Sequence, residues 1–181
     1  MLLCVVAVRM HFDNKLHKGE TVYFELVGYM NGSLVKKPYD NSKLEPFMFP
    51  GGYGDFIKRY GKKSKFHYGC TNSYKIYVYR ITHTDSDNII TDYSWQQVKS
   101  RCKQIGVKHV PEMNNIEISE DTSFVPAERE SVLDLAEYQC NSESSNFPDH
   151  LKEGVCVRIE NEDHDPILLK HKSFFFCVLD N

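Results

Sequence analysis

The sequence lacks the patterns that mark several classes of protein. Its six cysteines include no Cys-x-x-Cys pair, so the spacing typical of zinc sites is absent. The apolar run from Leu2 to Val8 has seven residues, which is too short to cross a bilayer. No internal repeat and no coiled-coil heptad is present. These absences argue against a zinc protein, a membrane-spanning protein and a repeat protein.

The chain also has little net charge, and no basic segment precedes its first apolar run. Its 22 basic and 25 acidic side chains leave a formal charge of −3, which disfavours an extended nucleic-acid-binding surface but allows a local basic groove. No basic segment precedes residues 2–8, which argues against a signal peptide. That run predicts a buried first strand, with an exposed apolar flap left by truncation as the alternative. Cys156 and Cys177 lie in apolar segments, as buried thiols do, which suits a reducing, cytoplasmic environment.

What is present is typical of a single soluble α+β domain. A length of 181 residues suits one hydrophobic core, and the 11 tyrosines and 11 phenylalanines favour a sheet-rich one. Residues 38–54 have no regular period and predict an ordered loop. Besides residues 2–8, strands are predicted over residues 21–29, 65–68, 75–82, 154–160 and 167–179, with a break expected near Lys172.

A helix is predicted over residues 93–105. Ser94 can cap its start and Gly106 can end it. An apolar stripe recurs on one face. It consists of Trp95, Val98, Cys102 and Ile105.

Two further helices are expected. One begins near Pro126 and runs to about Tyr138. The side chains that it should bury are Val132, Leu133 and Ala136. The other is a short helix around Lys58, with Asp55 as N-cap and Gly61 just beyond its end.

The last thirty residues carry the most informative pattern. Glu153 opens one apolar run, and Lys170 and Lys172 lie in the next, on the opposite side from His171 because strand side chains alternate. The polar stretch 161–165 predicts a reversal between two strands. A carboxylate facing two lysines across a hairpin suits a metal-bridged phosphate, in which the acid holds the cation and the amines neutralise phosphoryl oxygens. The plainer interpretation is a set of solvated charges on neighbouring strands.

Residues 153–158, Glu-Gly-Val-Cys-Val-Arg, and 169–173, Leu-Lys-His-Lys-Ser, resemble the fourth and fifth motifs of the covalent nucleotidyltransferases. This superfamily comprises ATP-dependent RNA and DNA ligases and capping enzymes, and phage- and virus-type RNA ligases resemble the chain more closely. The resemblance extends from about Gly19 to the last residue. Residues 22–29 resemble the third motif, residues 66–70 with 76–82 resemble the segment containing motif IIIa, and residues 107–111 and 172–179 also fit.

The resemblance implies a fold and a reaction. The fold is an α+β, antiparallel-sheet-rich nucleotidyltransferase domain of the ATP-grasp-like adenylation type. Residues 1–181 would hold motifs III to V of an RNA ligase adenylyltransferase domain that is incomplete at its N-terminus. Members of the family join RNA ends with ATP and Mg²⁺, through lysyl-AMP and RNA-adenylate intermediates.

The nucleophile of that reaction is missing from the sequence. The family uses the lysine of a Lys-x-Asp-Gly or Lys-x-His-Gly motif placed before the third motif, and the chain contains neither. Lys58 stands three residues before Gly61, but it follows the third motif and fits a short helix better. Positioning cannot replace a missing nucleophile. We therefore expect that the chain alone forms no covalent adenylate, and that the lysine lies on another polypeptide or on a missing N-terminal half.

Site residues follow from the resemblance. Glu25 would lie beside the nucleotide sugar and the metal, and Tyr79, with Tyr77 in reserve, would pack against the purine. Glu153 would hold Mg²⁺. Lys170 and Lys172 would be the catalytic lysines that contact the α-phosphate.

The residues taken alone have plainer roles. Glu25 is then an outward-facing strand residue, and Tyr77 and Tyr79 form cross-strand packing. Arg80 stands where relatives often have aspartate, and by itself it is a surface charge. Arg158 is a phosphate or RNA contact by one interpretation and a solvated strand end by the other.

A basic cluster offers a contact with RNA. It consists of Lys58, Arg59, Lys62, Lys63 and Lys65. These side chains either contact an RNA backbone or form a solvent-exposed charged surface. Three functions stay open: part of an RNA ligase, an inactive remnant that binds nucleotide or RNA, and a relative of DNA ligases or capping enzymes. The first predicts that Glu153, Lys170 and Lys172 converge on one triphosphate-sized pocket, with Glu25 lining its wall.

Overall fold

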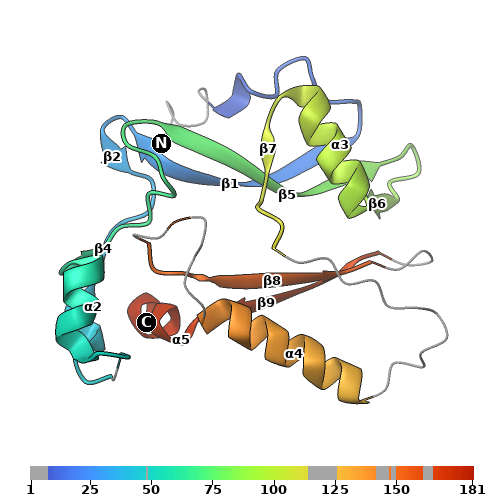
Figure 1. The fold of residues 1–181 in the computed structure, drawn as a ribbon. Coiled ribbons are helices and arrows are strands. Elements are labelled where there is room, and N and C mark those ends of the chain that lie inside the picture. The colour runs from blue at the N-terminus through green and yellow to red at the C-terminus, as the bar shows by residue number, and fades with distance from the viewer. Residues whose placement is uncertain (1–7, 48, 114–125, 142–146, 148–149, 161–164) are drawn as a thin grey trace. The chain divides into compact units, whose positions relative to one another are not determined.

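The computed structural model describes residues 8–47, 49–113, 126–141, 147, 150–160 and 165–181. The chain divides into two compact units (Figure 1). Unit 1 comprises residues 1–35, 70–112 and 159–167, and unit 2 comprises residues 36–69, 113–158 and 168–181. The described residues contain four α-helices and mostly antiparallel strands, which confirms the α+β prediction.

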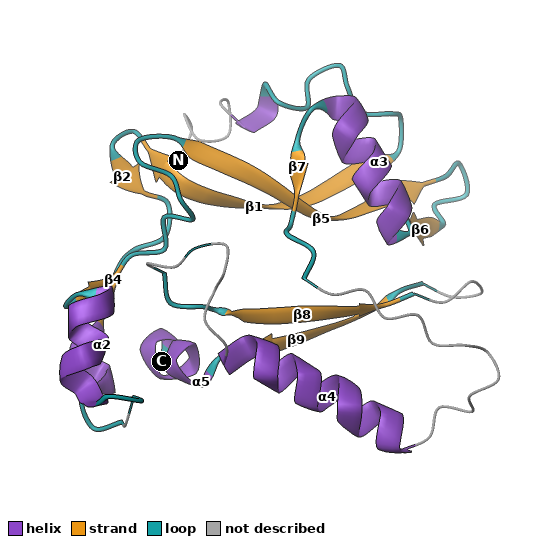
Figure 2. Cartoon of the chain, in the orientation of Figure 1, coloured by secondary structure: helices purple, strands orange, loops and turns teal. Residues whose placement is uncertain are grey.

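Unit 1 is built on a long antiparallel strand pair, β1 (Glu20–Met30) and β5 (Tyr74–Thr84). The two short strands β2 (Ser33–Leu34) and β6 (Ile90–Asp92) extend the pair at its sides, and β7 (Lys108–His109) runs parallel to β5 (Figure 2). The predicted strands 21–29 and 75–82 are therefore confirmed.

The β1–β5 register contains a bulge. Tyr23 stands opposite Arg80 and Phe24 opposite Val78, so Tyr79 is the extra residue on β5. A bulge bends the strand and turns the extra side chain away from regular pairing.

Helix α3 (Trp95–Ile105) covers one face of the β1–β5 pair (Figure 1). Ser94 and Gln97 form a reciprocal capping box at its start, and Gly106, with φ of 75°, ends it, as the sequence predicts. The apolar stripe of α3 meets the inward side chains of β5. The buried residues there are Ile76, Val78, Ile81, Val98 and Cys102.

Replacing Ser94 with alanine should lower the free energy of unfolding by about 1 kcal/mol, because the Gln97 backbone N–H loses its acceptor. Urea unfolding followed by the fluorescence of Trp95, the single tryptophan, measures this change. Ser100→Ala is the matched control. Ser100 is exposed inside the same helix, where alanine is the better helix former. Equal losses in the two variants would contradict the capping role.

Unit 2 contains most of the remaining elements. The strands β3 (Tyr39–Asp40) and β4 (Lys63–Ser64) pair with each other, and so do β8 (Gly154–Ile159) and β9 (Ile167–Lys172). The helical elements are η1 (Asn41–Leu44), α2 (Gly52–Tyr60), α4 (Pro126–Asn141) and α5 (Phe174–Asp180).

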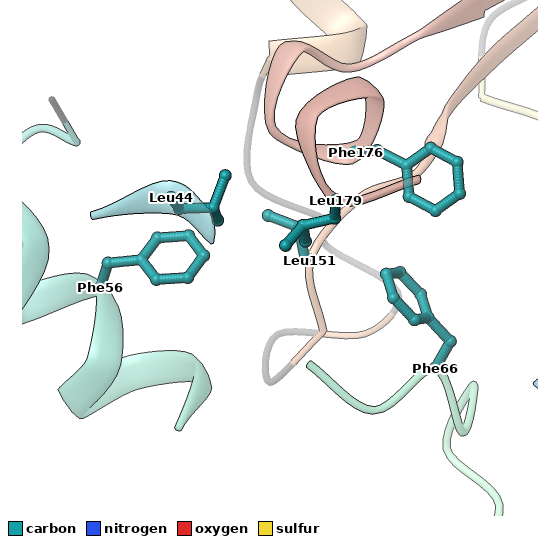
Figure 3. Packing of buried hydrophobic residues seen from close by; sticks show 6 residues of the cluster. All are labelled: Leu44, Phe56, Phe66, Leu151, Phe176 and Leu179. Carbon is teal, nitrogen blue, oxygen red and sulfur yellow. The ribbon is translucent and has the colours of Figure 1, made fainter. Parts of the chain in front are cut away.

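The core of unit 2 is aromatic. It joins η1, α2, the segment after β4 and α5 (Figure 3). Its buried residues are Leu44, Phe56, Phe66, Leu151, Phe176 and Leu179. Phe66 and Phe176 meet edge to face, with ring centroids 5.6 Å apart, which is a favourable aromatic geometry.

One strand prediction is wrong, and another is wrong in part. Residues 65–68 form no strand, because Tyr68 and Gly69 have positive φ and end the extended backbone. Residues 167–179 begin as β9 but continue as α5, since the Ser173 side chain accepts a hydrogen bond from the Phe176 N–H and caps a helix. A short apolar run does not by its periodicity distinguish a strand from a buried helix.

The helix predictions for unit 2 need smaller corrections. Helix α4 covers the predicted range, but Leu133 is exposed, whereas Ala136 is buried and Val132 partly buried. In α2 the N-cap is Gly51 instead of Asp55, and Gly61 ends the helix as predicted.

Three further predictions have mixed outcomes. The predicted loop 38–54 contains β3, η1 and the start of α2. Cys156 is exposed on β8 and Cys177 is half-buried in α5, so neither is the buried strand thiol that we predicted. The predicted strand 2–8 lies outside the described residues, apart from Val8.

Within the described residues, no helix has both the length and the hydrophobicity to cross a membrane.

Candidate functional site

The predicted site residues are divided between the two units. Glu25, Tyr77 and Tyr79 belong to unit 1, and Glu153, Lys170 and Lys172 belong to unit 2. The two groups are therefore described separately. The prediction that Glu25 lines the same pocket as Glu153 stays a prediction.

In unit 1, Glu25 and Tyr77 face each other across the β1–β5 pair. Phe24 and Leu26, the neighbours of Glu25, pack into the core beneath α3, so strand alternation directs Glu25 to the other face of the sheet. Glu25 is exposed and forms no hydrogen bond or ion pair with the described residues. Its carboxylate can accept new partners.

Tyr79 lies at the bulge of β5. Its side chain is 38% exposed, and its ring centroid is 6.4 Å from that of Tyr23 on β1. Tyr77 is partly buried. Of the two tyrosines that the sequence singles out, Tyr79 offers more ring surface to a ligand.

Arg80 is more than a surface charge. Its guanidinium makes two hydrogen bonds of 2.6 Å with the carboxylate of Asp92 and lies 5.0 Å from the Tyr23 ring centroid. Because Asp92 belongs to β6, this bidentate pair ties β5 to its neighbour. Arg80 therefore supports the sheet.

In unit 2, the base of the β8–β9 hairpin brings Glu153 beside Lys172. The Ser173 N–H donates to the Glu153 carbonyl at 2.9 Å, so the two segments are adjacent at this point. Gly154 permits this approach, since a Cβ there would collide with the His171 carbonyl oxygen. The Glu-Gly pair of the motif thus has a structural reason: the glycine closes the hairpin next to the carboxylate.

The Glu153 carboxylate is held by residues far away in the sequence. Its Oε2 lies 2.7 Å from Lys36 Nζ, and its Oε1 accepts a hydrogen bond from the Tyr68 hydroxyl. Lys36 is also held by aromatic rings. Its Nζ lies 4.3 Å from the Phe176 ring centroid and 4.8 Å from that of Phe66.

Lys172 forms a second ion pair near the same phenylalanine. Its Nζ lies 2.8 Å from Asp180 Oδ2 and 5.4 Å from the Phe176 ring centroid. The Tyr39 hydroxyl donates to the other oxygen of Asp180 at 2.6 Å. Burial, together with this hydrogen bond to Asp180, raises the pKa of Tyr39 to about 12, so Tyr39 remains a neutral donor at physiological pH.

The resulting group, here called the Glu153 cluster, consists of Lys36, Tyr39, Tyr68, Glu153, Lys172 and Asp180. It combines two amines and two carboxylates around Phe176. Lys170 lies outside it. Lys170 is exposed on β9, on the same side as Lys172 by alternation, and has no partner among the described residues.

Sequence reasoning missed four members of the cluster: Lys36, Tyr39, Tyr68 and Asp180. Lys36 is separated from Glu153 by 117 positions, and no local pattern connects the two. The sequence gives only a weak indication of two of these residues, through their positions relative to the motif-like segments. Tyr68 lies in the segment that resembles motif IIIa, and Asp180 follows the fifth motif closely.

The Glu153 cluster has the donors that a phosphate-bound Mg²⁺ requires. The ion takes one or two carboxylates and keeps its other positions for water and substrate phosphates. Each Glu153 oxygen uses one acceptor position for Lys36 or Tyr68 and has a second position left. Among the described residues, no group of three histidine, cysteine, aspartate or glutamate side chains is assembled for a metal.

Comparisons with protein-family models, with curated proteins and with solved structures returned no match. No family is therefore assigned to the chain, and its function is a proposal.

Proposed function

We propose that this chain binds ATP with Mg²⁺ as the nucleotide-binding part of an RNA-ligase-type adenylyltransferase. The observation that carries the proposal is the adjacency of Glu153 and Lys172 at the base of the β8–β9 hairpin. A carboxylate and an amine on adjacent chain segments suit a metal-bridged phosphate. The order of the motif-like segments along the chain supports the RNA-ligase type.

In this proposal each charged residue has a defined role. Glu153 holds the cation, which would bridge and neutralise the phosphates. Lys172 and Lys170 contact the α-phosphate oxygens. Lys36 keeps the Glu153 carboxylate oriented and partly neutralised before the nucleotide arrives.

The existing ion pair of Lys172 is weak enough to be exchanged. The side chains of Lys172 and Asp180 are 40% and 35% exposed, and ion pairs as open to water as this one contribute little to stability. The α-phosphate of ATP carries one negative charge on two non-bridging oxygens, as a carboxylate does, so it can take the place of Asp180 as the partner of Lys172. Lys172 can therefore exchange Asp180 for the α-phosphate at small cost.

Glu25 and Tyr79 are the proposed contacts for the nucleoside. Within unit 1, the exposed ring of Tyr79 can pack against a purine, with Tyr77 as the alternative, and the free carboxylate of Glu25 can accept a ribose hydroxyl.

We further propose that the chain alone does not form lysyl-AMP. Lys36 is the amine nearest to Glu153, but its Nζ is held in the ion pair with Glu153 and over the Phe176 ring, whereas a nucleophile must be free to approach the phosphorus atom. The sequence contains no Lys-x-Asp-Gly or Lys-x-His-Gly motif elsewhere. The nucleophile would then come from another polypeptide, and RNA would be the substrate of the assembled enzyme. A cytoplasmic location remains part of the proposal.

Incubation with α-labelled ATP and Mg²⁺, followed by a denaturing gel, should give no labelled band at 21.1 kDa. Equilibrium binding should nevertheless detect ATP–Mg²⁺. Glu153→Gln and Lys172→Gln should each weaken that binding about 10- to 150-fold, since charge-assisted contacts contribute about 1.5–3 kcal/mol. Lys103→Gln, an exposed lysine of unit 1, is the control and should bind as the unmodified chain does.

Each alternative has its own outcome. A labelled band would refute the absence of a nucleophile, and Lys36→Met would then test whether Lys36 is the acceptor. Preference for GTP would favour a capping-type relative, and activity on a nicked DNA duplex after addition of the missing polypeptide would favour a DNA ligase. Failure to bind any nucleotide would refute the proposed function.

A further inference from the structure

A surface hollow follows the C-terminal end of α2. The chain leaves α2 at Gly61, whose φ is 75°, and enters β4. The hollow has a volume of about 440 Å³. It is lined by Tyr60, Gly61, Lys62, Lys63, Lys65 and His67.

The lining of this hollow is basic. It includes three lysines and a histidine and no carboxylate. Lys62, Lys63 and Lys65 are exposed and form no ion pair with the described residues. The nearest acid by strand register is Asp40, opposite Lys63, and its carboxylate accepts a hydrogen bond from the Ser42 N–H. Asp40 attracts Lys63, but the three lysines outnumber this one acid, so the hollow keeps a net positive charge.

The lysines are held on a fixed backbone. Ser64 and Phe66 alternate with Lys63 and Lys65 and point inward: Ser64 donates to Asn41 within the protein at 2.8 Å, and Phe66 lies in the core (Figure 3). The Asn41 side chain also donates to the Gly61 carbonyl at 2.7 Å. These buried anchors force the lysines outward.

The spacing of the lysines suits a chain of anions. Residues two positions apart on an extended backbone are about 7 Å apart and point to the same side. Lys63 and Lys65 can therefore reach different charged groups of one elongated ligand. Tyr60 and His67 add ring surfaces at the same place, and grooves that bind single-stranded nucleic acids combine cations with aromatic rings in this way.

We propose that this hollow binds the backbone phosphates of a single-stranded nucleic acid, with Lys62, Lys63 and Lys65 as the phosphate contacts. The inference depends on the local structure of unit 2 and does not rest on the proposed ATP site. Its residues are distinct from those of the Glu153 cluster, so an experiment can refute one of the two binding proposals and leave the other intact.

The test is fluorescence anisotropy with a labelled oligouridylate of about 12 nucleotides. Domains that bind single-stranded nucleic acids cover about 4–16 nucleotides each. The full chain is compared with a triple variant, Lys62→Gln, Lys63→Gln and Lys65→Gln. Three lost phosphate contacts reduce the salt dependence of binding by about two powers of salt concentration. Between about 50 and 200 mM salt, the Kd of the unmodified chain should therefore rise about 20-fold more than that of the variant.

The matched control replaces three exposed lysines of unit 1, Lys18, Lys103 and Lys108, with glutamine. Both triple variants have the same net charge, so only the position of the lost lysines differs. The control should bind oligouridylate as the unmodified chain does. Binding of ATP–Mg²⁺ should be unchanged in both variants.

Three results would overturn the proposal. In the first, the unmodified chain does not bind oligouridylate. In the second, the control loses as much affinity as the Lys62, Lys63 and Lys65 variant, so the attraction is a property of total charge. In the third, inorganic tripolyphosphate competes at the same concentration as the oligonucleotide and depends on the same lysines, so the site recognises free polyphosphate.

Discussion

Replacing Arg101 with methionine should lower the free energy of unfolding of unit 1 by about 3–5 kcal/mol. Arg101 of α3 makes two hydrogen bonds, of 2.7 and 2.8 Å, to the carboxylate of Glu20 at the start of β1. The side chains are 10% and 0% exposed. Removing the guanidinium leaves a carboxylate in the protein interior without its cation.

The pH dependence of this loss identifies its cause. Burial alone would raise the pKa of Glu20, but the hydrogen bonds from Arg101 and from the His17 N–H, together with the attraction to the Arg101 charge, hold the pKa below the ordinary value. Without Arg101, burial still raises the pKa of Glu20, so protonation of Glu20 in the folded state becomes more favourable. The difference in the free energy of unfolding between the unmodified chain and the variant should therefore shrink as the pH falls. Urea unfolding followed by Trp95 fluorescence measures this difference.

A double variant provides the control. Glu20→Leu with Arg101→Met removes both charges and should be less destabilised than Arg101→Met alone, because no unpaired charge remains. If the double variant is as unstable as the single one at every pH, the loss comes from packing and the electrostatic explanation is wrong.

The stability of unit 2 should fall by about 2–3 kcal/mol between pH 7 and pH 4.5 through His150 alone. His150 is 5% exposed, and its ring centroid lies 4.7 Å from that of Phe66 and 4.5 Å from that of Tyr68. Its Nδ1 donates to the Leu151 carbonyl at 2.9 Å, since a carbonyl oxygen can only accept. Nε2 is buried without a hydrogen-bond partner among the described residues.

Burial lowers the pKa of His150 to about 4. Among the charged neighbours, His67 and Lys36 lower this pKa and Glu153 raises it. Between the ordinary value of 6.5 and about 4, the unfolded chain binds a proton at His150 that the folded chain does not. The contribution of neutral His150 to the free energy of unfolding is therefore complete above pH 6.5 and is lost as the pH falls towards 4.

Urea unfolding at both pH values, followed by near-ultraviolet circular dichroism of the aromatic core, measures this loss. His150→Phe should remove it, since phenylalanine does not titrate. His171→Gln is the control and should keep the pH dependence of the unmodified chain, because His171 is exposed. An unchanged pH dependence in His150→Phe would exclude His150 as its source.

Local patterns were sufficient for the regular elements that have strong signals. Strands β1 and β5 follow from long alternating runs, and α3 follows from an apolar stripe with Ser94 and Gly106 at its ends. The segment after Lys172 was assigned wrongly, because six apolar residues in succession satisfy both periods. Only the Ser173 cap, formed with the Phe176 N–H, selects the helix.

Local sequence signals suffice for the hairpin that brings Glu153 next to Lys172, since a polar reversal between two apolar runs is a short-range pattern. The partners of these charges depend on long-range packing. Lys36 pairs with Glu153 across 117 positions, and Asp180 pairs with Lys172 through a helix that the sequence did not predict. The physical reason is that ion pairing depends on distance in space, and packing around Phe176 sets those distances after the chain has folded.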